Sequence, residues 1–242
     1  MLTKLQTALR DYAESVLLEE RFVWDFPHEG LPPTVVSALQ EGSPFEKNIA
    51  LKNSLKSHLT SSGYPIEYWI IQTWGGIQGF KQNGKNDYRI RELYQQLGKK
   101  SFPNQLFDVI SSLSKVASFY DPNQYSIYDS RAVFSLNWLL LKSGATQNFF
   151  HMPSGRNSKI AKYDMETIIR LKCGDKPGLF VENREAYFEY CHLLKTLSPS
   201  VWDDSERKIM PFYLEMLLFV LGPEEIVEDI EKSSTLDIRA AV

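Results

Sequence analysis

Apolar residues recur at three- and four-residue spacing along most of the chain, and no stretch shows the strict apolar-polar alternation of a β-strand. This spacing predicts helices at 2–18, 34–41, 45–59, 65–73, 87–97, 103–113, 129–141, 158–171, 182–197 and 203–221, and a short acidic helix from Pro223. The expected fold class is therefore all-α.

The segment 129–141 is the most apolar of these predicted helices. Val133, Phe134 and its four leucines leave almost no polar face, so we expect a buried core helix. Asp129 is its expected N-cap, because a short carboxylate at that position accepts backbone N–H bonds. In the helix 203–221, Asp203 is the expected N-cap, and Pro211 should introduce a kink.

Two long loops are expected between the helices. The first begins with Trp74, Gly75 and Gly76, and its glycines give a backbone that can approach a ligand closely. It equally fits a plain connection that carries a core tryptophan. The second loop covers 143–158.

Charge and composition narrow the class of protein. The chain has 242 residues, of which 43% are hydrophobic and 24% charged, as in an ordinary globular protein. A net charge of −3 and a pI of about 5.9 argue against a protein that coats nucleic acid by charge alone. Basic residues nevertheless gather in one window: Lys81, Lys85, Arg89, Arg91, Lys99 and Lys100. Since 223–231 is strongly acidic, we expect one basic and one acidic face.

Several classes of site have no support in the sequence. Cys173 and Cys191 lie far apart without a disulfide framework, which fits a reducing, cytoplasmic location. The four histidines lack metal-ligand spacing, and no phosphate-binding glycine loop or nucleophile elbow occurs. The N-terminus does not resemble a signal peptide, and no run reaches the roughly 18 apolar residues of a membrane span. We expect a monomer with no metal, cofactor or membrane partner.

Two ionisable groups stand out in the central stretch 110–140. Lys115 follows an expected turn at Ser111–Ser114, so its ammonium would face the positive end of a helix dipole, and its amine would be the better nucleophile. Asp129, as an N-cap, would stay ionised. A turn between them could bring the amine and the carboxylate into one cleft, which is suitable equipment for attack at a sugar C1′.

The residues around this pair resemble a known family. Leu-Ser-Lys-Val-Ala-Ser-Phe at 113–119 and Tyr-Ser-Ile-Tyr-Asp-Ser-Arg-Ala at 125–132 are similar to the helix-hairpin-helix DNA glycosylases of the 8-oxoguanine glycosylase fold. Three more stretches resemble a bacterial branch often found among phage-defence genes: Gln72–Phe80, His151–Asn157 and Glu215–Phe219. The resemblance covers roughly Ile66 to Phe219.

The resemblance implies a fold, a reaction and a partner. The fold would be a single two-lobed unit, with lobes at 1–64 plus 143–242 and at 65–142. Lys115 would attack C1′ of a nucleotide flipped out of double-stranded DNA, and Asp129 would support it. The excised base would be 8-oxoguanine or a modified phage base such as glucosylated hydroxymethylcytosine. A strand-cleaving lyase step could follow.

The implied binding residues fall into two groups. Those assigned to the flipped base are Trp74, Gly75, Gly76, His151, Arg156, Asn157 and Trp202. Those assigned to the DNA backbone are Ser112, Ser114, Arg131, Lys81 and Lys85. Trp74 could also fill the gap that the flipped base leaves.

The sequence departs from the family pattern in two places. The expected hairpin turn at Ser111–Ser114 has none of the glycines that approach a DNA phosphate in better-known members. The separation of Lys115 and Asp129 is only 14 residues, which makes Asp121 a rival carboxylate. Two alternatives therefore stay open. The protein could be a non-catalytic sensor of modified DNA or of a nucleotide, or a helical interaction protein in which both residues are structural.

Overall fold

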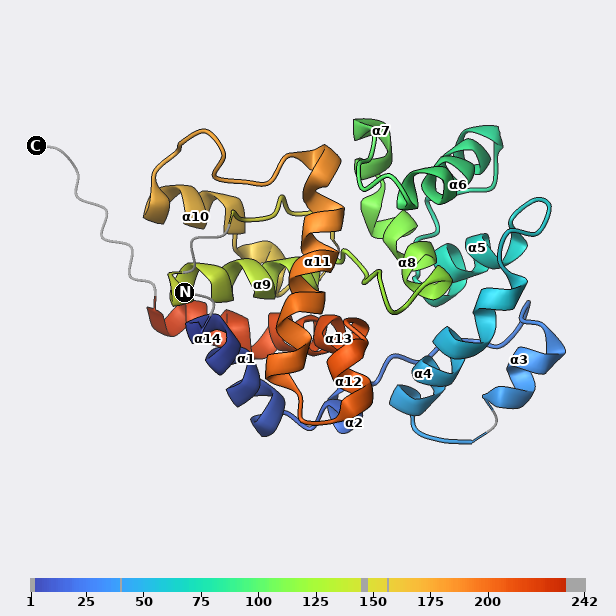
Figure 1. Cartoon of the computed structure of the whole chain (residues 1–242), viewed down its shortest axis with the longest axis horizontal. Coiled ribbons are helices and arrows are strands. Elements are labelled where there is room, and N and C mark those ends of the chain that lie inside the picture. The colour runs from blue at the N-terminus through green and yellow to red at the C-terminus, as the bar shows by residue number, and fades with distance from the viewer. Residues whose placement is uncertain (1–2, 40, 145–147, 156, 234–242) are drawn as a thin grey trace, which may run out of the picture.

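The computed structural model describes residues 3–39, 41–144, 148–155 and 157–233, and within these ranges the fold is all-helical with no strand (Figure 1). The expected fold class is therefore confirmed. The helices are α1 (Thr3–Ser15), α2 (Leu18–Arg21), α3 (Pro33–Ala38), α4 (Pro44–Leu55), α5 (Pro65–Trp69), α6 (Gly84–Leu97), α7 (Asn104–Phe107), α8 (Ile110–Tyr120), α9 (Ser130–Ser143), α10 (Met165–Cys173), α11 (Asn183–Val201), α12 (Ser205–Ile209), α13 (Phe212–Leu221) and α14 (Val227–Ser233). Four short turns complete them: η1 (Lys56–His58), η2 (Ile70–Trp74), η3 (Ile160–Lys162) and η4 (Gly222–Ile226).

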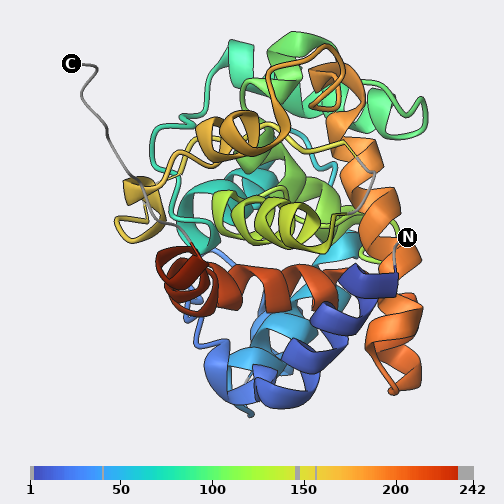
Figure 2. The same ribbon diagram turned by 90° about the vertical axis from the view of Figure 1, so that its left-hand side faces the viewer.

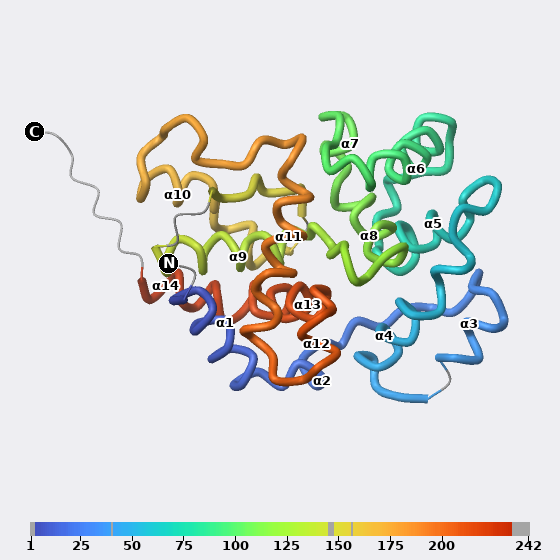
Figure 3. The backbone as a smooth tube through the Cα atoms, viewed as in Figure 1, coloured from blue at the N-terminus to red at the C-terminus, as the bar shows by residue number. Residues whose placement is uncertain are grey.

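The helices form two groups that lie side by side (Figures 1 and 2). The middle lobe contains α3 to α8, and the terminal lobe contains α1, α2 and α9 to α14. Within these groups α4 packs against α8, and α9 packs against α13 and α1. The tube in Figure 3 shows the chain crossing from α2 in the terminal lobe to α3 in the middle lobe, and returning after α8.

The centre of the terminal lobe is the pair α9 and α13. Ten of the 14 residues of α9 and nine of the 10 residues of α13 are buried, and the apolar pattern of 129–141 predicted this burial of α9. The Ser135 hydroxyl donates to the Leu218 carbonyl at 2.7 Å and joins the two helices. A Cβ at Gly222 would lie 3.1 Å from the Arg131 carbonyl oxygen, so a glycine allows η4 to approach α9 this closely.

Helix α8 begins earlier than the sequence indicated. The expected turn at Ser111–Ser114 is wrong, because these residues form the first turns of α8 and the break falls at Asp108 and Val109 instead. Ser114 is fully buried, and its hydroxyl accepts a hydrogen bond from the Tyr128 amide at 3.0 Å. Helix α8 is therefore fixed to the segment that leads into α9.

Two further boundaries differ in ways that affect the cavity described below. The expected helix 65–73 starts at Pro65 but loosens into the wider π turn η2, in which the Gly75 amide donates to the Ile70 carbonyl at 2.8 Å. Such π turns are frequent at functional sites. The expected helix 203–221 is two helices, α12 and α13, that meet at Pro211.

The N-cap of α12 also differs from the expected one. Asp204 is the cap, and its Oδ1 accepts from the Arg207 amide at 2.9 Å. Asp203 instead pairs with Arg10 of α1 at 2.6 Å.

Candidate active site

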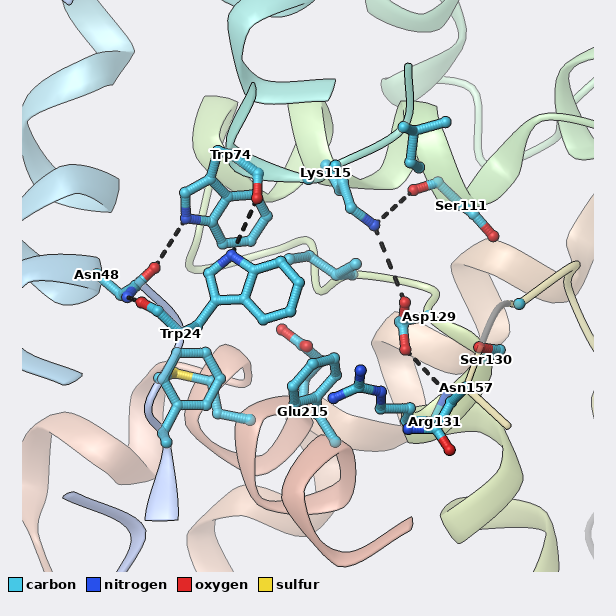
Figure 4. A pocket seen from close by; sticks show the side chains of 18 of the residues that line it. Trp24, Asn48, Trp74, Ser111, Lys115, Asp129, Ser130, Arg131, Asn157 and Glu215 are labelled. Atoms are coloured by element: carbon cyan, nitrogen blue, oxygen red, sulfur yellow. Dashed lines mark hydrogen bonds and ion pairs between the residues drawn. The ribbon is translucent and has the colours of Figure 1, made fainter. Parts of the chain in front are cut away.

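A cavity of about 280 Å³ lies where the two lobes meet, and we call it the first cavity (Figure 4). The middle lobe contributes α4, the residues that follow η2, and α8, whereas the terminal lobe contributes the start of α9 and one face of α13. The loops before α3 and before η3 close its sides.

One wall of the first cavity is aromatic and held by hydrogen bonds (Figure 4). The Trp24 indole N–H donates to the Trp74 carbonyl at 2.9 Å, and the Trp74 indole N–H donates to Asn48 Oδ1 at 2.8 Å. Asn48 in turn donates to the Trp24 and Pro44 carbonyls. Phe219 lies edge-on to Trp24, with ring centroids 5.8 Å apart. These contacts fix flat apolar surfaces around the cavity.

Lys115 reaches the cavity from α8, where it is the sixth residue. Only 7% of its side chain is exposed. Its Nζ donates to the Ser111 carbonyl at 2.9 Å and lies 4.0 Å from Asp129 Oδ2. Burial lowers the pKa of Lys115, while Asp129 and Glu215 oppose that shift. The expected position at the start of a helix is wrong, so burial and not the helix dipole accounts for the weaker base.

Asp129 is the N-cap of α9, as predicted. Its Oδ1 accepts from the Arg131 amide at 2.8 Å, which leaves Oδ2 directed toward Lys115 (Figure 4). The structure thus brings together the two residues that the sequence singled out. The rival Asp121 ends α8, where its Oδ1 accepts from the Asn123 amide at 3.2 Å, and it does not line the cavity.

Arg131 also lines this cavity. Its guanidinium carbon lies 4.4 Å from the centre of the Phe219 ring, so the side chain stacks on an aromatic face of the wall.

Two charged residues at this site were given no role by the sequence. Lys52 on α4 and Glu215 on α13 both line the first cavity, although each is almost completely buried. Burial raises the pKa of Glu215 to about 7, while Lys52 acts in the opposite direction. Burial likewise lowers the pKa of Lys52 to about 8 against the opposing effect of Glu215. For Glu215 the available signal was a single charge inside an otherwise apolar helix, which is costly without a partner. Lys52 gave no such signal, because α4 carries other charged and polar residues.

Glycines allow two backbone segments to approach the site closely. A Cβ at Gly75 would lie 2.6 Å from Lys115 Cδ and 2.8 Å from the Ile71 carbonyl oxygen. Gly76 follows with φ of +65°, a conformation that other residues rarely adopt. At Gly155 an added Cβ would overlap the Ser130 side chain. The predicted close approach of the loop is therefore an approach to the candidate nucleophile.

The predicted site residues in the loop at 148–155 and 157–162 line two different cavities. Asn157 lines the first cavity, and its Oδ1 accepts from the Lys159 and Ile160 amides. His151 lines a second cavity of about 590 Å³, where it stacks on Phe180 and lies 3.3 Å from Glu166. Arg156 lies outside the described residues.

The second cavity shares part of its wall with the first. The residues common to both are Ile77, Ser111, Ser154 and Gly155. The second cavity also contains Arg89 and Ser112, of which Ser112 was predicted to contact DNA. The first turn of α8 forms part of its lining.

Four predicted residues lie away from both cavities. Trp202 is buried under the Arg207 guanidinium, whose carbon lies 5.3 Å from the ring centre. The Ser114 hydroxyl is buried and occupied, as described above, so it cannot contact DNA in this structure. Lys81 and Lys85 are exposed just before and at the start of α6.

Comparison with protein-family models, curated proteins and solved structures gave no match. Within the described ranges, no three His, Cys, Asp or Glu side chains are grouped so that they could hold a metal ion. Of the helices in those ranges, none has the length and apolar character needed to cross a bilayer.

Proposed function

We propose that the protein is a DNA N-glycosylase that excises a modified base within the first cavity. The observation that carries the proposal is the position of Lys115. A buried amine of lowered pKa lies 4.0 Å from an Asp129 carboxylate oxygen at the wall of a cavity of about 280 Å³. Burial makes an amine lose its proton more easily, and the neutral amine is the nucleophile; the neighbouring carboxylate can accept the proton that it sheds.

The shape of the site supports a flipped nucleotide as substrate. A base inside a duplex cannot reach groups this deeply buried, so it would have to rotate out of the helix. The volume is close to the lower limit, roughly 300 Å³, of pockets that hold small ligands, which suits one base with its sugar. The Trp24, Trp74 and Phe219 rings offer faces on which a base can stack.

The proposed chemical step uses the two predicted residues. The lone pair of Lys115 Nζ forms a bond to C1′, while the bond from C1′ to the base breaks and its electron pair leaves with the base. A proton from solvent neutralises the departing base, and Asp129 takes the extra proton of the new C1′–N bond. If the C1′–O4′ bond then opens and O4′ takes up a proton, the product is an imine, which allows strand cleavage.

The neighbouring second cavity suits the DNA strand. It opens beside the first cavity and contains Arg89, while the exposed Lys81 and Lys85 lie on the same segment of the middle lobe. Cationic side chains of this kind bind phosphates without regard to sequence. We therefore infer that the backbone flanking the flipped nucleotide runs over the second cavity.

The base itself is the least determined part of the proposal. The candidates remain 8-oxoguanine and a modified phage base such as glucosylated hydroxymethylcytosine, with roles in DNA repair or in defence against phage.

A panel of duplex oligonucleotides tests the proposal. Each duplex carries 8-oxoguanine, uracil, hydroxymethylcytosine or glucosylated hydroxymethylcytosine, and abasic sites are measured with and without alkali. We expect release of one base, and loss of that release in Asp129→Asn.

A second function, the non-catalytic sensor of modified DNA, is favoured by one observation. The serines that stand where a glycine hairpin was expected lie inside α8, so that stretch forms no glycine phosphate cradle. If the protein binds DNA but releases no base from the panel, the sensor function replaces the glycosylase function as the proposal.

A further inference from the structure

Asn48 closes a ring of hydrogen bonds in the aromatic wall of the first cavity (Figure 4). The Trp24 indole N–H donates to the Trp74 carbonyl at 2.9 Å, and the Trp74 indole N–H donates to Asn48 Oδ1 at 2.8 Å. Asn48 Nδ2 then donates to the Trp24 carbonyl at 2.7 Å, which completes the ring. The second hydrogen of Nδ2 is donated to the Pro44 carbonyl at 2.8 Å.

The side-chain amide of Asn48 is matched to these three partners. Two backbone carbonyls require donors and one indole N–H requires an acceptor, and an amide group supplies both kinds. Asn48 is 1% exposed, so water does not replace these bonds. Leucine has a similar size and would make none of them.

The ring joins three segments that are distant in sequence. Trp24 lies where the chain crosses from α2 to α3 (Figure 3), Asn48 lies on α4, and Trp74 ends η2. The two indole rings are held with their centroids 6.2 Å apart and their planes at 58°. Hydrogen bonds in a closed network strengthen one another, so loss of one should loosen the other two.

The ring lies across the cavity from the proposed reactive pair. Trp24, Trp74 and Asn48 are on the left in Figure 4, whereas the Lys115 amine and Asp129 are on the right. Trp24 is only half-buried, so part of its ring remains open to a ligand. A ligand that spans the cavity would place a flat ring against the indoles and its reacting carbon near the amine.

We propose that Asn48 is a positioning residue that holds the Trp24 and Trp74 indoles as one stacking face for the flat ring of the ligand. A face that is fixed before the ligand arrives loses little conformational freedom on binding. The role of Asn48 therefore concerns the base and not the sugar or the strand. The identification of the flat ring as a flipped base rests on the proposed function.

Hydrogen exchange of the indole N–H groups tests the ring without any ligand. NMR of protein labelled at tryptophan nitrogen follows each of the five indoles. In Asn48→Leu we expect the Trp74 N–H to exchange at least about tenfold faster. The Trp24 N–H should accelerate as well, although Asn48 is not its acceptor. The N–H groups of Trp69 and Trp138, which have other partners, should not change.

Binding of duplexes separates a role in stacking from a role in folding. In a Lys115→Met background, so that no base is released, fluorescence anisotropy compares the panel with an unmodified duplex and with one that carries tetrahydrofuran and no base. Asn48→Leu should weaken binding of the preferred modified duplex about tenfold and leave the tetrahydrofuran duplex unchanged. Asn137→Leu is the matched control, because Asn137 is fully buried, bonds to the Phe150 amide and carbonyl, and lines neither cavity.

Three results overturn the role of Asn48 even if a base is released from duplex DNA. They are unchanged exchange of Trp24 in Asn48→Leu, equal weakening of the modified and tetrahydrofuran duplexes, and no duplex of the panel that binds more tightly than the unmodified one. If Asn48→Leu does not fold, exchange in the unsubstituted protein decides. One common free energy of opening for Trp24 and Trp74 supports the ring, and two different values contradict it.

The proposed function fails in a different way. Joint exchange of the two indoles and weakening that depends on the base, in a protein that releases no base, leave this inference standing and remove the enzyme.

Discussion

The two cavities share four wall residues but hold their charged groups in different ways. In the second and larger cavity, Glu166 pairs with His151 and Arg170, and the Met152 amide donates to it at 2.9 Å. In the first and smaller cavity, Lys115, Lys52 and Glu215 are buried, and an oxygen of Glu215 has no partner among the described residues. Perturbed ionisable groups cluster at functional sites, so the smaller cavity is the candidate for chemistry.

The comparison also assigns different tasks to the two places. In the second cavity His151 and Glu166 pair with each other and can fix the loop that carries His151. Arg89 can then bind a phosphate. Groups held away from water in the first cavity gain most from the arrival of a ligand. Substitutions in the first cavity should therefore affect the reaction, and those in the second should affect binding.

The largest expected effect is that of Lys115→Met. This substitution removes the amine and retains most of the packing volume, so the rate of base release should fall by more than about 10³-fold. Single-turnover assays measure the rate. Lys172→Met, at an exposed position of α10 away from both cavities, is the matched control, and equal losses in the two variants would contradict a special role for the buried amine.

Asp129→Asn should have the next largest effect. Asparagine also caps helices, so α9 should keep its first turn while the negative charge beside Lys115 is lost. We expect a fall in rate of about 10²- to 10³-fold with little change in melting temperature. Asp204→Asn, at the N-cap of α12, makes the same change away from both cavities and should leave the rate unaltered.

Glu215→Gln should change how stability depends on pH. The folded protein holds a proton on Glu215 up to about pH 7, whereas the ordinary pKa is 4.5. The stabilising effect is thus complete below about 4.5 and is lost as the pH rises through about 7, a difference of about 3 kcal/mol.

Urea unfolding at several pH values measures this effect. Between pH 5 and 7 the free energy of unfolding of the unsubstituted protein should decrease relative to that of Glu215→Gln. In Glu215→Gln, Lys52 also loses its counterion. This loss changes the difference in unfolding free energy between the two proteins in the same direction. Parallel curves for the two proteins would show that Glu215 is not perturbed.

Gly75→Ala tests the close approach of the loop to Lys115. The added methyl group would lie 2.6 Å from Lys115 Cδ, so the amine or the loop must move. A displacement of about 1 Å costs up to about 10²-fold in rate. Gly98→Ala is the control, because no atom lies within 4 Å of a Cβ added there and Gly98 lines neither cavity. Full activity in Gly75→Ala would contradict the claim that the loop positions the amine.

The smallest expected effect is that of Arg89→Ala in the second cavity. Loss of one phosphate contact should weaken duplex binding several-fold and reduce the slope of log K against log salt by about 1. The single-turnover rate at saturating enzyme should not change. A lower saturating rate would place Arg89 in the chemistry and remove the distinction between the two cavities.

The sequence predicted what local interactions determine. The helical class, the burial of α9 and the Asp129 cap follow from apolar spacing and from one short carboxylate. The predicted pair Lys115 and Asp129 also meets, because α8 and the start of α9 are joined by a short segment that is fixed at Ser114. The predicted start of α8 was wrong because Ser111 to Ser114 lack the glycines or prolines that would enforce a turn.

The parts that could not be predicted depend on distant packing. Lys52 and Glu215 are 163 positions apart, and no local pattern indicates that both charges face one cavity. His151 and Trp202 looked equally suited to a binding pocket, yet one lies in the second cavity and the other lies beneath Arg207. The π turn at η2, which carries Gly75 toward Lys115, likewise has no signature in its apolar sequence.

The central claim is that Lys115 is the reactive amine, and borohydride trapping on a duplex that contains an abasic site tests it without knowledge of the base. The open sugar presents an aldehyde at C1′, borohydride reduces the imine formed with an amine, and mass spectrometry of the digested protein locates the adduct. The account predicts an adduct on Lys115 that is absent with a tetrahydrofuran analogue and weaker in Asp129→Asn. An adduct confined to surface amines such as Lys81 and Lys85, or no adduct from a protein that still releases a base, would contradict it.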